Sequence, residues 1–249
     1  MANFKTHIST STILGIGYGA GAYFGWGMEL SHCVVAAGLC SIAGMLPDLD
    51  SDNGVPVRET LCFVAALVPA LMIERFHSMG LNQEQIVLTC AAIYIGIRFG
   101  VGKIFRKYTV HRGMWHSIPA AAIAGLATFM VCMCPDFGVR LFKAWAVVLG
   151  FLSHLILDEI YAIDLNGKRL PRLKRSFGTA LKFFGKSAWG NVTTYAKLAV
   201  LVLIAMSDAS TMAFFNTEPL ELGGIKQTTT EFVGKVIPVV EEKVNEVLR

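Results

Sequence analysis

The chain has 249 residues, of which 54% are hydrophobic and only 16% are charged, and its mean hydropathy is +0.54. This composition is too apolar for a soluble globular domain and excludes that class. The net charge of +4 is small, and the basic residues gather in a few loops, so the charge indicates membrane topology and argues against a nucleic-acid partner.

Long apolar runs follow one another along the chain, and about 20 such residues cover the hydrocarbon layer of a bilayer. We expect crossings at about 8–28, 30–46, 60–76, 85–105, 117–134 and 142–161, with a less complete seventh at 195–206. Glycines in the first run include small-xxx-small spacings, which let helices approach closely. The sequence therefore predicts an all-α fold, a polytopic membrane helical bundle with about six to seven transmembrane helices.

The predicted transmembrane domain covers residues 1–215 and includes a basic connector at 162–194, and an amphipathic tail follows at 216–249. From Pro171 onward, Leu173, Phe177, Leu181 and Phe184 recur at helical spacing. This pattern predicts an interfacial helix lying on anionic lipid, and an ordinary charged loop explains the connector equally well.

Four polar segments lie at ends of these runs, and each is separated from the next by two crossings. They contain His7, Asp48, His111 and Asp158. An even number of crossings returns the chain to the same face, so we expect all four segments on one side of the membrane. That face carries 14 of the lysines and arginines and the opposite loops carry 3, which makes it cytoplasmic by the positive-inside rule.

His154 and Asp158 are four residues apart in an apolar helical run, so their side chains share a face. Ionisable groups are expensive in a membrane and usually face the bundle interior. A single histidine there would more often be a packing residue, but the pair favours a ligand role. Asp48 and Asp50 follow Pro47, and alternate residues of an extended segment point the same way. The alternative for these two carboxylates is a turn that caps the next helix.

The loop before the fifth run holds His111, Arg112 and His116, and His7 precedes the first run. A guanidinium beside such a cluster suits a phosphate or carboxylate of a substrate, although Arg112 also fits the ordinary positive charge of a cytoplasmic loop. For Trp115 we expect a place in the interfacial aromatic belt.

The candidate metal ligands are nitrogen and oxygen donors without a thiolate, since the six cysteines lie in or beside apolar runs as small buried side chains. Such donors suit a divalent ion, zinc or manganese first and non-haem iron next. The set exceeds the needs of one tetrahedral zinc, so either some members support the others or two ions share the site. Its members are His7, Asp48, Asp50, His111, His116, His154 and Asp158.

These elements, in this order, resemble the YdjM-like family of membrane-bound metal-dependent hydrolases, an inner-membrane family linked to LexA regulation. The motifs are His7, Pro47-Asp48-Leu49-Asp50, His111-Arg112-Gly113 through His116-Ser117, and Ser153-His154 through Asp158. The resemblance covers about residues 3–190, and Trp115 stands where the family often has a small hydroxyl residue. It implies a multi-span helical protein of the inner membrane with hydrolase activity.

Our first hypothesis is a metal-dependent hydrolase that activates water for attack on a lipid or phosphoester substrate at the cytoplasmic interface. Asp50 or Asp158 would accept a proton, and Arg112 would hold a phosphate. A divalent-metal or proton-coupled transporter is the alternative, although transport sites tend to lie near the midplane. A non-catalytic membrane scaffold is a further alternative. The sequence predicts membrane lipid as a partner and does not indicate an oligomeric state.

Overall fold

The apolar runs form helices in the computed structural model, which describes residues 3–50, 55–101, 103, 113–134, 136–164, 172–173, 178 and 180–216. Two short helical segments follow longer helices: the 3-10 helix η1 (Leu46–Asp50) and the π-helix η2 (Gly96–Val101). Two two-residue strands, β1 (Ile163–Asp164) and β2 (Arg172–Leu173), pair antiparallel. The helices are α1 (Phe4–Trp26), α2 (Leu30–Ala43), α3 (Val55–Leu71), α4 (Ile73–Ser78), α5 (Gln83–Ile95), α7 (Ile118–Val131), α8 (Phe137–Ile160), α9 (Ala188–Ser207) and α10 (Ala209–Asn216).

Three helical segments among the described residues are long and apolar enough to cross a bilayer. They are Gln83–Val101, Phe137–Ile160 and Ala188–Ser207, while α2 and α7 are apolar but shorter. This finding confirms a helical membrane protein, the coarser part of the fold prediction. Half of the most apolar window of α8 is buried inside the protein, against 6% for Gln83–Val101 and 11% for α9. α8 is therefore a central helix, and the other two are peripheral.

Local signals in the sequence explain where several helices begin. The Asn82 side chain accepts from the backbone N–H of Gln85, whose side chain accepts in return from Asn82, and this capping box starts α5. The Asp136 carboxylate accepts from Gly138 and Val139 at the start of α8. Because of the Asp136 cap, α8 begins at Phe137 rather than 142. The Ser187 side chain caps α9, which begins at Ala188 rather than 195.

Of the two alternatives for the connector, an interfacial helix and an ordinary loop, the helix is wrong for the described part. Residues 180–187 are not helical, and Arg172–Leu173 is a strand. The structure divides into two units, Met1–Ser210 and Thr211–Arg249. Residues 217–249, almost the whole predicted tail, lie outside the described part, and the predicted domain boundary at 215/216 stays a prediction.

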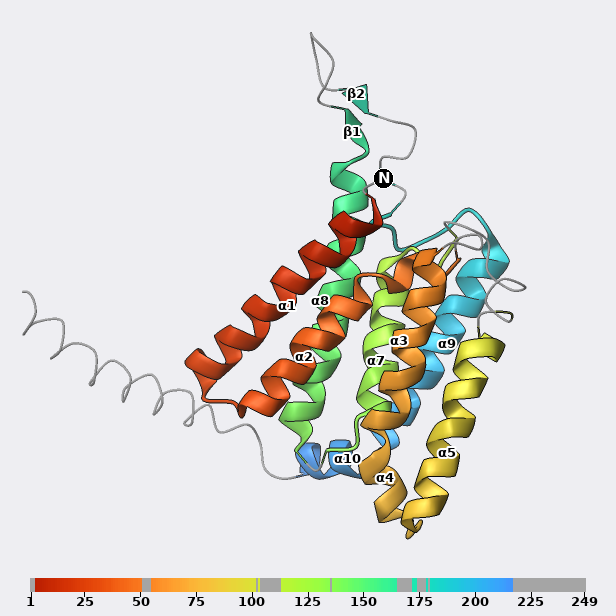
Figure 1. Ribbon diagram of the computed structural model, residues 1–249. Coiled ribbons are helices and arrows are strands. Elements are labelled where there is room, and N and C mark those ends of the chain that lie inside the picture. The colour runs from red at the N-terminus through yellow and green to blue at the C-terminus, as the bar shows by residue number, and fades with distance from the viewer. Residues whose placement is uncertain are drawn as a thin grey trace, which may run out of the picture. The chain divides into compact units, whose positions relative to one another are not determined.

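Within the first unit, α1, α2 and α8 pack on one another, and α7 packs between α8 and α9 (Figure 1). A Cβ on Gly15 would lie 2.6 Å from the carbonyl oxygen of Ala37, and one on Gly19 would lie 2.8 Å from that of Cys33. These two glycines therefore form the contact between α1 and α2, as the small-xxx-small spacing predicts. The other glycines of the first predicted run, at positions 17, 21 and 25, have nothing within 4 Å of an added Cβ.

A buried ion pair lies near the start of α8, where the sequence predicts a loop charge. Arg140 is 2% exposed, and its guanidinium lies 2.7 Å from the carboxylate of Asp208. It also donates to the carbonyl oxygen of Phe129 and lies over the ring of that residue. Arg140 is one of the three charges that the lysine and arginine count assigns to loops on the opposite face, and this assignment is wrong because the residue lies in α8. Its charge is paired inside the protein.

Candidate metal centre

His154 is the central residue of a polar cluster near the carboxyl end of α8. Its ring is fully buried, and Nδ1 lies 2.8 Å from the carbonyl oxygen of Gly44. A carbonyl oxygen only accepts, so Nδ1 carries the proton and Nε2 presents its lone pair. This hydrogen bond fixes both the tautomer and the ring orientation, as backbone carbonyls do for metal-binding histidines.

His7, in the first turns of α1, stacks on the ring of His154. The ring centroids are 3.7 Å apart with 13° between the planes, and Nε2 of His7 lies 3.5 Å from Oδ1 of Asp158. Asp158 follows His154 by one helical turn, and its Oδ2 lies 3.9 Å from Nε2 of His154. All three side chains are at most 2% exposed.

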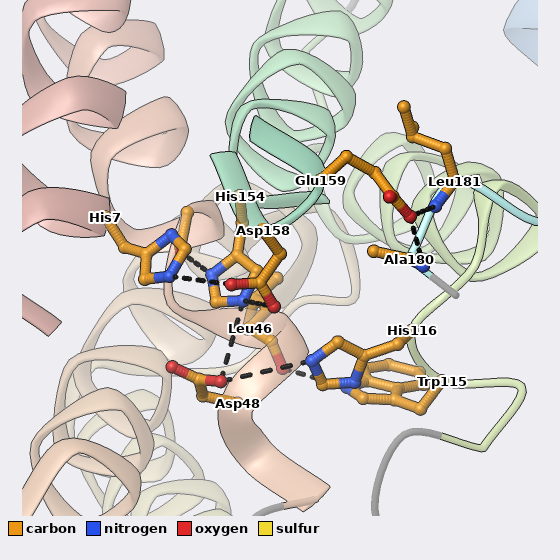
Figure 2. A network of polar contacts seen from close by, with 11 residues as sticks. His7, Leu46, Asp48, Trp115, His116, His154, Asp158, Glu159, Ala180 and Leu181 are labelled. Atoms are coloured by element: carbon orange, nitrogen blue, oxygen red, sulfur yellow. Dashed lines mark hydrogen bonds and ion pairs between the residues drawn. The ribbon is translucent and has the colours of Figure 1, made fainter. Parts of the chain in front are cut away.

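Asp48 and His116 complete the cluster from two other segments. Oδ1 of Asp48, in η1, lies 3.5 Å from Nε2 of His154 and 4.0 Å from Nε2 of His116. His116 lies two residues before α7, which begins at Ile118 because the Ser117 side chain caps the helix and Pro119 follows. Figure 2 shows the five side chains turned toward one another from four separate segments.

The donor atoms form two groups in which every pair lies within 4.8 Å: His7 with His154 and Asp158, and Asp48 with His116 and His154. Both groups contain His154, and its one available nitrogen can bind one ion. Nε2 of His154, Nδ1 of His7 and both carboxylate oxygens of Asp158 are buried without a hydrogen bond among the described residues. Burying such groups without compensation is costly, and a cation would supply that compensation. The residues therefore fit a divalent ion held by nitrogen and oxygen donors.

The structure brings together five of the seven predicted ligands. His111 and Arg112 lie outside the described residues, and the side chain of Asp50 is likewise not described. Their predicted roles as ligand, phosphate-binding group and proton acceptor stay predictions. His32 and His77, which the crossing count places on the opposite face, are absent from both donor groups.

Trp115 makes contacts that the sequence does not predict. Its indole Nε1 donates to the carbonyl oxygen of Leu46 over 2.8 Å, and its ring meets Phe151 edge to face. The place of Trp115 in the aromatic belt stays a prediction. Within the protein, Trp115 links the segment that carries His116 to the segment that carries Asp48 (Figure 2).

Glu159 is a buried carboxylate that belongs to none of the motifs in the sequence. It follows Asp158 directly and is 9% exposed, and its oxygens accept from the backbone N–H groups of Gly178, Ala180 and Leu181. The available signal was a second acidic residue beside Asp158 at the end of an apolar run, but its partners lie in a segment without a recognisable motif.

Comparison with protein families matches residues 1–217 to the family described as YdjM inner membrane protein. No curated protein and no solved structure matches the chain.

Proposed function

The chain belongs to the YdjM inner membrane protein family, and from this premise we propose that it is a membrane-embedded, metal-dependent hydrolase with its centre at the cytoplasmic ends of the helices. We further propose six to seven crossings, with α1, α2, α3 and α7 spanning beside the three long apolar segments. The crossing count and the lysine and arginine distribution support this topology.

One observation carries the metal assignment. Three imidazoles and two carboxylates from four segments gather in the protein interior. Those of His7, His154 and Asp158 have polar atoms that make no hydrogen bond within the described part of the chain. A packed core would not be expected to retain such groups unless another component compensated them. The position of these groups on helices of a membrane protein strengthens the argument, because ionisable side chains within transmembrane segments usually mark functional sites.

The exposure of the ligands indicates where a substrate enters. The Asp48 side chain is 21% exposed, whereas the side chains of His116 and His154 are exposed by 1% or less. A substrate would therefore approach from the side of Asp48. Because the centre lies at the ends of helices, this side is at headgroup depth in the proposed topology. Lipids and phosphoesters at the membrane surface are the substrate classes that fit this position.

His7, Asp48, His116, His154 and Asp158 would hold the ion, one ion or two. A bound divalent ion would supply Lewis acidity, which lowers the pKa of water and stabilises negative charge on a reacting oxygen. A carboxylate oxygen of Asp158 or Asp50 would accept the proton, and Arg112 would orient a phosphate through its paired N–H groups.

Elemental analysis of the purified full-length protein tests the metal assignment. We expect zinc or manganese to co-purify with the wild type and to be lost from His154→Ala, because that variant removes the one residue common to both donor groups. His32→Ala is the matched control, since His32 lies outside those groups, and it should keep its metal. Equal metal content in His154→Ala and the wild type would remove the basis of the proposal.

A reconstituted assay separates hydrolysis from transport. We expect the metal-loaded protein in liposomes to release product from a lipid ester or phosphoester, and the His154→Ala variant to lose that activity. Uptake of metal into the liposomes without hydrolysis of any tested lipid would favour a carrier instead. The position of the centre at one end of the helices argues against a carrier, because transport sites tend to lie near the midplane.

A further inference from the structure

Glu159 is held in an arrangement that a merely solvated carboxylate would not have. Oε2 accepts from Gly178 over 2.7 Å, and Oε1 accepts from Ala180 over 2.7 Å and from Leu181 over 3.2 Å. Gly178 has φ of +76°, a conformation that favours glycine. The three N–H groups compensate the charge of the buried carboxylate, so Glu159 fixes this part of the connector to the end of α8.

The connector continues from this point as residues 180–187, which we term the strap. The carbonyl oxygen of Lys182, in the strap, accepts from the backbone N–H of Ile118, two residues after His116. Gly185 packs so closely on Met114 that an added Cβ would lie 3.0 Å from the sulfur atom. The strap therefore contacts the His116 segment on both sides of the histidine.

The other side of the strap is anchored to α9. The Asn191 side chain bonds to both the backbone N–H and the carbonyl oxygen of Gly185, over 2.7 Å and 3.0 Å. The Tyr195 hydroxyl donates to the carbonyl oxygen of Phe183 over 2.9 Å. With Glu159 at one end and α9 at the other, the strap holds the segment 114–118 against the rest of the centre.

We propose that Glu159 is a positioning residue for the metal centre, which acts on His116 through the strap. The inference rests on the proposed function, because it assumes that His116 is a ligand. Asp158 and Glu159 are neighbours on α8 and have different roles. Asp158 faces the ion donors, and Glu159 faces the strap that places a donor from another segment (Figure 2). Groups that orient ligands typically change metal affinity by about 10- to 100-fold.

Zinc titration of the full-length protein in detergent, in competition with a chromogenic chelator, tests this inference. We expect Glu159→Ala to bind zinc about 10- to 100-fold more weakly than the wild type. Glu159→Gln keeps an oxygen that can accept from Ala180 and Leu181, so its affinity should lie between the two. Asp208→Asn is the matched control, because it weakens a buried ion pair near the other end of α8 and should leave zinc affinity unchanged.

The outcomes separate the two proposals. A wild type that does not bind zinc or manganese overturns both the proposed function and this inference. A wild type that binds while Glu159→Ala binds equally well overturns the inference alone. If Glu159→Ala does not fold, Glu159→Gln decides, and wild-type affinity in that variant overturns the inference. An equal loss of affinity in Asp208→Asn also overturns it, because the effect would then follow from general destabilisation.

Discussion

Individual charged residues in this protein differ in how their charges are compensated. Arg140 is buried but has a carboxylate, a carbonyl oxygen and an aromatic ring around its guanidinium. Asp158 is also buried, yet its oxygens make no hydrogen bond among the described residues. The first pattern is typical of a structural ion pair and the second of a ligand site, although both residues lie on α8.

This difference predicts that a substitution in the ion pair changes stability and leaves metal content unchanged. Asp208→Asn should lower the free energy of unfolding by about 1–3 kcal/mol, because it removes the charged partner of a buried guanidinium. Its metal content should equal that of the wild type. Unfolding in mixed detergent micelles, followed by elemental analysis, measures both quantities. Unchanged stability, or loss of metal, would contradict the structural role of this pair.

Pairs of helices depend on glycines where backbones approach closely. A Cβ on Gly150 of α8 would collide with the carbonyl oxygen of Cys40 in α2 and lie 2.9 Å from Cβ of Ala43. The same contact brings Gly44, just after α2, within reach of His154. The packing of α2 on α8 therefore places the carbonyl oxygen of Gly44 where it accepts a hydrogen bond from His154.

Gly150→Ala should consequently destabilise the protein by about 1–3 kcal/mol, a typical effect of overpacking, and weaken metal binding. Gly17→Ala is the control, because nothing lies within 4 Å of a Cβ at that position of α1. It should be neutral or stabilising, since alanine favours helix over glycine by about 0.5–1 kcal/mol. Thermal unfolding in detergent compares the two, and equal midpoints would show that the contact between α2 and α8 is not tight.

The strap shows why one predicted element fails. Apolar residues at helical spacing predicted a helix through 181–184, but the backbone N–H groups of Gly178, Ala180 and Leu181 donate to Glu159 instead of to helical carbonyl oxygens. Periodicity in the sequence describes which side chains share a face. It carries no information about a carboxylate on another element that competes for the backbone donors.

For the whole molecule, the prediction of the centre rested on the number of expected crossings between its polar segments. The apolar runs predicted where most helices lie, and the resemblance to the YdjM family is confirmed by the match over residues 1–217. The even number of crossings predicted that the segments containing His7, Asp48, His111 and Asp158 would be neighbours. The structure brings His7, Asp48 and Asp158 together with His116 of the third segment, whereas His111 lies outside the described residues. The contacts of Trp115, Arg140 and Glu159 could not be predicted, because each depends on a partner far away in the sequence.

The proposed topology can be tested with single cysteines on opposite sides. We expect Ser78→Cys, at the end of α4, to react with a membrane-impermeant maleimide added to intact spheroplasts. Ala188→Cys, at the start of α9, should react only after the membrane is permeabilised, because its side carries most of the lysines and arginines. The wild type measures the background from the six native cysteines. The reverse labelling pattern would place the centre outside the cytoplasm.

The ligands come from α1, η1, the segment before α7, and α8, so the centre is distributed over most of the chain. During synthesis His7 leaves the ribosome early and Asp158 late. A nascent chain therefore cannot present the full donor set until α8 has entered the bilayer, and a truncated product cannot present it at all. Under the proposed function, ion uptake would follow membrane insertion, and a bound ion would mark a chain whose biogenesis has passed that stage.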